Sequence, residues 1–121
     1  MTRQLLVITL SLLFAVILYG QGKSVKITGN LIDNACAESA RDLDTTAKNH
    51  STSCALMDSC ETSGYAVYAD KKLYKLDEKG NGSAADLLKS TKTAKGVRVS
   101  VEGTVEGDTI HVTKLTEIAA N

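Results

Sequence analysis

Apolar and polar residues alternate strictly in the last third of the chain. Val97, Val99 and Val101 stand at every second position between polar residues, a pattern typical of a strand with one buried face. The turn residues Glu106-Gly107-Asp108 follow, and residues 109–113 are again strand-forming. The chain is therefore predicted to end in an antiparallel pair of strands.

Three further strand patterns precede this pair. Residues 25–32 alternate around Gly29, and residues 64–69 and 73–76 are rich in strand-forming side chains. The residues between the last two segments are few enough for a hairpin. Residues 33–63, in contrast, are rich in Ala, Ser, Thr and Asp and show no strand pattern. We therefore expect a long insertion between the first and second strands.

A short helix is expected between the third and fourth strands. Gly80-Asn81-Gly82 is typical of a loop, and Ser83 with Asp86 three residues later has the spacing of a capping box. These residues predict a helix of about two turns that begins at Ser83.

The predicted order is strand, helical insertion, two strands, helix, two strands. This is the order of a five-stranded OB-like barrel, so the predicted fold is mainly β with helices (α+β). Gly29 and Gly103 interrupt strand patterns where a small barrel needs a bend or a bulge. A β-sandwich fragment is the alternative, but its edge strands stay exposed, whereas a barrel largely removes them.

The first 22 residues are typical of a secretory signal peptide. Arg3 precedes an apolar run from Leu5 to Leu18, which is shorter than the roughly 20 residues that cross a bilayer. Cleavage after Gly22 leaves residues 23–121 as one OB-like domain, periplasmic or secreted and without membrane contact. An uncleaved anchor that extends to Tyr19 is the alternative.

Charge excludes some classes of partner. Without Arg3, the 14 basic side chains fall to 13, against 14 acidic ones. A domain this close to neutral has no long-range field that attracts nucleic acid or an anionic membrane. We expect a monomer whose partner is a small molecule or a protein.

The insertion, residues 33–63, contains all three cysteines and one of the two histidines. His50, Cys54 and Met57 are spaced four and then three residues apart, so in a helix they share one face, and Cys60 follows at the end of that stripe. Cys36, at the start of the insertion, would complete a cluster. Imidazole, thiolate and thioether groups form a soft ligand set suited to Cu(I), Zn(II) or a haem iron.

A structural role for the same stripe is the alternative. Ala40, Leu43 and Ala47 continue its spacing upstream, and an apolar helical stripe usually faces a core, where Cys and Met are ordinary residues. The spacing of the cysteines and His50 also differs from that of common zinc sites, which have two close pairs.

A disulfide is expected within the insertion. Residues 51–53 are helix-starting residues, so we expect a break near Asn49 and a helical hairpin that returns Cys36 toward Cys54 and Cys60. Cys54 and Cys60 are too far apart on one helix to bond to each other. Cys60 is the favoured partner of Cys36 because the helix is expected to end there.

Three tyrosines of the mature chain are weaker candidates. Tyr65, Tyr68 and Tyr74 would suit a stacking platform for a bound ligand. The basic groove that accompanies stacking in OB-folds is missing from the composition, so core and barrel-surface positions are the alternative.

Several segments together give a resemblance to a known group of proteins. They are Asp33-Asn34-Ala35-Cys36, His50 to Cys60, Ser63-Gly64-Tyr65-Ala66-Val67-Tyr68, and residues 101–110. The chain resembles small exported bacterial proteins of unknown function with an OB-like barrel and a first loop that contains Cys and His. Because that group has no established activity, the resemblance implies only the fold and the compartment.

Three functions follow from these patterns. The first is an exported, non-enzymatic binding or interaction module stabilised by one disulfide. The second is a protein that handles Zn, Cu or haem through the Cys/His/Met insertion. The third is a thiol-redox protein, which ranks last because the chain lacks a Cys-x-x-Cys pair.

Overall fold

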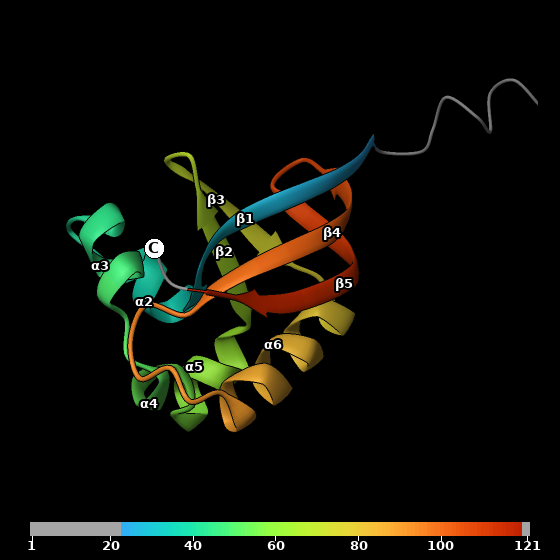
Figure 1. Ribbon diagram of the computed structural model, residues 1–121. Helices are drawn as coiled ribbons and strands as arrows, with labels where there is room; N and C mark the ends of the chain where they lie inside the picture. Colours follow the sequence, from blue (N-terminus) through green and yellow to red (C-terminus); the bar gives the residue numbers. More distant parts are fainter. Residues whose placement is uncertain (1–22, 120–121) are drawn as a thin grey trace, which may run out of the picture.

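The computed structural model describes residues 23–119, a mixed α+β fold (Figure 1). The strands are β1 (Lys23–Asp33), β2 (Tyr65–Ala69), β3 (Lys72–Leu76), β4 (Arg98–Glu106) and β5 (Thr109–Ile118). The helices are α2 (Asn34–Ser39), α3 (Leu43–Asn49), α4 (Thr52–Ala55), α5 (Asp58–Ser63) and α6 (Glu78–Ser90). The five predicted strands are confirmed.

The strands form one sheet that closes into a ring in the order β1-β2-β3-β5-β4. Neighbouring strands are antiparallel except β3 and β5, which run parallel through the pairs Lys75–Thr109 and Leu76–Ile110. The long strand β1 pairs with β2 through its C-terminal half and with β4 along most of its length, and so joins the two sides of the ring.

Two glycines allow the strands to approach closely. A Cβ atom at Gly29 would lie 2.2 Å from the backbone oxygen of Tyr68, and one at Gly103 would lie 2.1 Å from that of His111. The register of β4 against β5 also shifts between Glu102 and Gly103. The predicted bulge at Gly103 is therefore present, and Gly29 serves close packing of the backbone.

The core fills the inside of the ring. Val99 and Val101, both fully buried, pack there against β2, β5 and three residues of α6: Ala84, Ala85 and Leu88. Helix α6 thus covers one end of the ring (Figure 1). A second, smaller cluster lies under α2 and α3 and consists of Ile32, Ala37, Ala47 and Tyr68.

Helix α6 differs from its prediction. It begins at Glu78, not at Ser83, and includes the glycines that were expected to form a loop. The carboxylate of Asp77 accepts a hydrogen bond from the Gly80 backbone N–H at 2.9 Å and caps the helix there. A Cβ atom at Gly80 would lie 2.5 Å from Val112, so this glycine lets the helix pack closely on the sheet.

The insertion folds as four short helices, not as a hairpin of two. The expected break is present, because α3 ends at Asn49 and the Ser51 hydroxyl caps α4 by accepting from the Cys54 N–H. Two further breaks occur, one at residues 40–42 between α2 and α3 and one at Met57, whose backbone is extended, between α4 and α5. The predicted common helical stripe is therefore wrong.

The predicted signal peptide, residues 1–22, lies outside the described residues. Within residues 23–119, no helix has both the length and the apolar character needed to cross a membrane.

Candidate functional site

Asp33 lies at the centre of a polar cluster where β1 meets the insertion. It is the last residue of β1 and the N-cap of α2, and its carboxylate Oδ2 accepts from the Cys36 N–H at 2.9 Å. The residue is fully buried. Burial of a carboxylate is costly unless it is paired and hydrogen-bonded, so its partners decide whether this segment is stable.

His50 is the principal partner of Asp33. Its Nε2 lies 2.6 Å from Asp33 Oδ1, and its side chain is 8% exposed. The tautomer of the His50 ring decides which of these two atoms donates the hydrogen bond. His50 stands between α3 and α4, and its backbone oxygen accepts from the Gly96 N–H at 3.0 Å, which fixes the link to the loop before β4.

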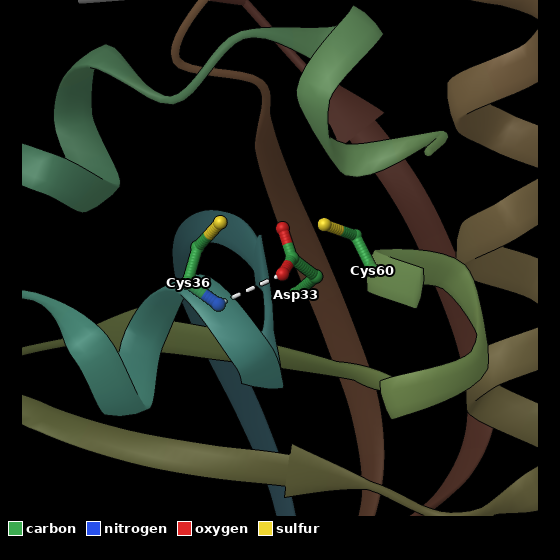
Figure 2. Close-up of side chains that lie close together, drawn as sticks. All are labelled: Asp33, Cys36 and Cys60. Atoms are coloured by element: carbon green, nitrogen blue, oxygen red, sulfur yellow. Dashed lines mark hydrogen bonds between the residues drawn. The ribbon is translucent and has the colours of Figure 1, made fainter. Parts of the chain in front are cut away.

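Two thiols complete the cluster. Cys36 comes from the first turn of α2 and Cys60 from α5, and Figure 2 shows the Asp33 carboxylate between them. The ligand atoms of Asp33, Cys36 and Cys60 all lie within 4.8 Å of one another. Three donors from three separate elements thus converge in a buried space.

The environment keeps the Cys36 thiol protonated. Burial, followed by the negative charge of Asp33, raises the pKa of Cys36 to about 12. A thiol with such a pKa is a poor nucleophile at neutral pH, so Cys36 is unsuited to thiolate attack on a substrate.

The predicted disulfide is absent from the structure. All three cysteines are free thiols, and the Cys36 and Cys60 sulfurs are 4.2 Å apart and not bonded. The prediction that these two residues meet is correct. In the view of Figure 2 the Asp33 carboxylate is seen between the two thiols, and its ligand atom lies within 4.8 Å of both sulfurs.

Two predicted metal ligands lie outside the cluster. Cys54 is exposed on α4, and Met57, between α4 and α5, is 57% exposed. The helix is interrupted at His50 and again at Met57, and both residues have extended backbones. The side chains of His50, Cys54 and Met57 therefore do not share one helical face. The haem alternative, which depended on this stripe, gains no support.

The three tyrosines do not form a platform. Tyr65 is buried, and its hydroxyl donates to the Ala55 backbone oxygen at 2.7 Å, while Tyr74 packs against the core. Tyr68 lies on the other face of β2, in the smaller cluster. Burial raises the pKa of Tyr65 to about 12 and, with the nearby Asp44 carboxylate, also raises the pKa of Tyr68.

Sequence reasoning missed Asp33. The available signal was its position, since an aspartate that ends a strand and precedes a helix is a typical N-cap, and Cys36 follows at the position whose N–H the cap binds. A cap is a local role, however. The contact of Asp33 with His50 has no such local signal, because His50 is 17 positions away in the sequence.

Comparison of the chain with protein-family models, curated proteins and solved structures found no match.

Proposed function

We propose that this protein is an exported metal-binding module in which Asp33, Cys36 and Cys60 bind Zn²⁺. The observation that carries the proposal is the convergence of these three ligand atoms within 4.8 Å. Zinc is bound in proteins by thiolate, imidazole and carboxylate groups, whereas Cu(I) prefers sulfur ligands alone. The carboxylate in the set therefore favours zinc.

The distances fit a metal better than a disulfide. Zn–S bonds of about 2.3 Å in a tetrahedral site place the two sulfurs about 3.8 Å apart. The observed separation is 4.2 Å, so a small movement of both thiols suffices. A disulfide would bring the sulfurs to about 2.05 Å, which requires a larger shift of both thiols.

His50 acts as a positioning residue in this proposal. Its hydrogen bond to Oδ1 fixes the Asp33 carboxylate, and such outer partners commonly orient the ligands of metal sites. Three protein ligands leave a fourth position for water or a bound molecule, as in zinc sites that take part in chemistry or exchange.

The scaffold we propose is an OB-like barrel. The closed strand order β1-β2-β3-β5-β4, the parallel contact of β3 with β5 and the helix between β3 and β4 support this assignment. The cluster lies where the insertion leaves β1, outside the ring.

Metal binding is tested on the reduced, purified protein. Native mass spectrometry with added Zn²⁺ is expected to show one ion per chain. Cys36→Ser and Cys60→Ser should each weaken zinc binding by about 10-fold or more, since each removes one of three ligands. Cys54→Ser is the matched control and should bind as the unmodified chain does. Equal behaviour of all three variants would exclude this site.

Export is tested separately. We propose that residues 1–22 are removed and that the protein is periplasmic or secreted, as the apolar run and the small residues before Lys23 indicate. Expression in a Gram-negative host should place a protein with an N-terminus near Lys23 in the periplasm. An intact Met1 species in the membrane fraction would contradict this.

A structural disulfide between Cys36 and Cys60 is the second candidate role, favoured by their proximity. Exposure of the metal-free protein to oxidised glutathione would then give an intramolecular disulfide with loss of two protons and two electrons, and two glutathione thiols as the reduced product. Bound Zn²⁺ should block this oxidation if the metal uses the same sulfurs.

A further inference from the structure

A polar pocket of about 610 Å³ lies on the outer face of the sheet and is lined by residues other than those of the metal cluster. Its floor is a row of three residues that stand directly opposite one another on neighbouring strands. Tyr68 on β2 pairs with Asn30 on β1, and Asn30 pairs with Arg98 on β4. The row is therefore set by the sheet register and not by a flexible loop.

The walls of the pocket bring three lysines around this floor. Lys48 comes from α3, Lys71 from the β2–β3 turn and Lys95 from the loop that precedes β4. Together with Arg98 they give four cations, against the two carboxylates Asp44 and Asp70.

Basic and acidic side chains are equal in number over the chain, 14 of each, so this excess is local. The total charge of the chain does not reveal it. Lys48 is paired with Asp44 at 2.9 Å. Among residues 23–119, the other three cations of the pocket make no ion pair.

The walls are held in place by backbone contacts. Gly96 has a φ of 63°, and a Cβ atom there would lie 2.4 Å from the Lys48 backbone oxygen. The Asn30 side-chain amide donates to the Gly96 backbone oxygen at 3.2 Å. On the opposite side, Asp70 and Lys71 both have positive φ, as the two central residues of a tight hairpin turn do, and this turn fixes the position of Lys71.

We propose that this pocket binds a small phosphorylated molecule, with Arg98, Lys95 and Lys71 around the phosphate. Arginine presents parallel N–H donors that match phosphate oxygens, and lysines add point charges. Tyr68, which pairs with Asn30 on the side away from Arg98, is the aromatic residue among those that line the pocket, and it would face the organic part of the ligand. This site is independent of the zinc proposal, because it shares no residue with the metal cluster.

The test uses isothermal titration calorimetry of the purified exported protein with phenyl phosphate and, separately, inorganic phosphate. Both should bind in a saturable manner, phenyl phosphate more tightly, and binding should weaken as salt is added. Arg98→Gln and Lys95→Gln should each reduce the affinity about 10-fold or more, because each removes a charge-assisted hydrogen bond. Arg41→Gln, at an exposed site outside the pocket, is the control and should change the affinity less than about 2-fold.

Three outcomes would overturn the proposal. The first is the absence of saturable binding by the unmodified protein. The second is an equal affinity for the Arg98, Lys95 and Arg41 variants when thermal melts show all three folded. The third is binding that is lost in Cys60→Ser and retained in Arg98→Gln, since the phosphate would then bind to the metal. Zinc stoichiometry measured on the same variants keeps the two sites distinguishable.

Discussion

The contact between His50 and Asp33 should be among the strongest single interactions in the domain. The Nε2–Oδ1 distance is 2.6 Å, and the side chains are 8% and 0% exposed, so water and salt screen the pair little. We expect Asp33→Ala to lower the free energy of unfolding by about 3–5 kcal/mol, because it removes one partner of a buried pair and also the cap of α2. His50→Ala should cost a similar amount by leaving the carboxylate unpaired.

A double-mutant cycle isolates the interaction. A hydrogen bond to a charged group contributes about 1.5–3 kcal/mol, so the double variant should be less destabilised than the sum of the single variants by that amount. Guanidinium unfolding of the reduced protein, with a chelator present, measures this coupling energy without a contribution from bound metal. The matched control is His111–Glu106, with an Nε2–Oε2 distance of 2.9 Å and side chains that are 49% and 80% exposed.

The control pair should give a coupling energy of about 1 kcal/mol at most, because both groups are solvated. Both pairs join a histidine to a carboxylate at similar distances and differ strongly in burial. His111 Nδ1 also lies 3.6 Å from Asp77 Oδ2, and this second carboxylate is kept in every variant of the control cycle. A coupling of Asp33 with His50 that is no larger than that of the control pair would refute the argument that burial makes this contact strong.

Three further predictions concern the core, the thiols and alkaline pH. Val99→Asp should unfold the domain by burying an unpaired charge, whereas Thr116→Asp on an exposed position of β5 should change stability by about 0.5 kcal/mol or less in thermal melts. Cys54 should react with a thiol reagent first, the half-buried Cys36 more slowly and the buried Cys60 only upon unfolding, which peptide mass mapping over time will show. The pKa values of Cys36 and Tyr65 are raised from 9.0 and 10.0 to about 12, so the unfolded chain loses these protons first. Stability should therefore be full below pH 9 and fall toward pH 12, and a flat profile in urea unfolding would contradict this.

The strands were predictable because their signal is local. Alternation at Val97, Val99 and Val101 reports a buried face directly, and the two in-strand glycines report close backbone approach. The start of α6 was not predictable from the same rules. Gly80 looks like a loop residue in isolation, and only the contact with Val112 on a distant strand shows why a helix needs glycine there.

The candidate site was predictable in part. The meeting of Cys36 and Cys60 follows from a chain that must turn back within the insertion. The role of Asp33 and the loss of Cys54 and Met57 depend on two helix breaks a few residues apart, and a shift of one residue in either break redirects every side chain that follows. The pocket at Arg98 was not predictable from total charge, since it arises from strand register.

The composition of the insertion supports a role for the polar cluster beyond packing. The apolar cluster beneath α2 and α3 has only four buried residues, two of them alanines, which is a small core for these two helices, whereas α4 packs on the main core through Ala55. Short helices are not stable alone, so their order must come from tertiary contacts. The contacts around Asp33 and His50 supply these, and a bound metal would add to them by linking α2 and α5 to the end of β1. Hydrogen exchange should therefore slow in α2 and α5 when Zn²⁺ is added and remain unchanged in β4 and β5, which the ring already holds in place. Equal slowing in all four elements, or slowing in none of them, would show that metal binding at this site does not order the insertion.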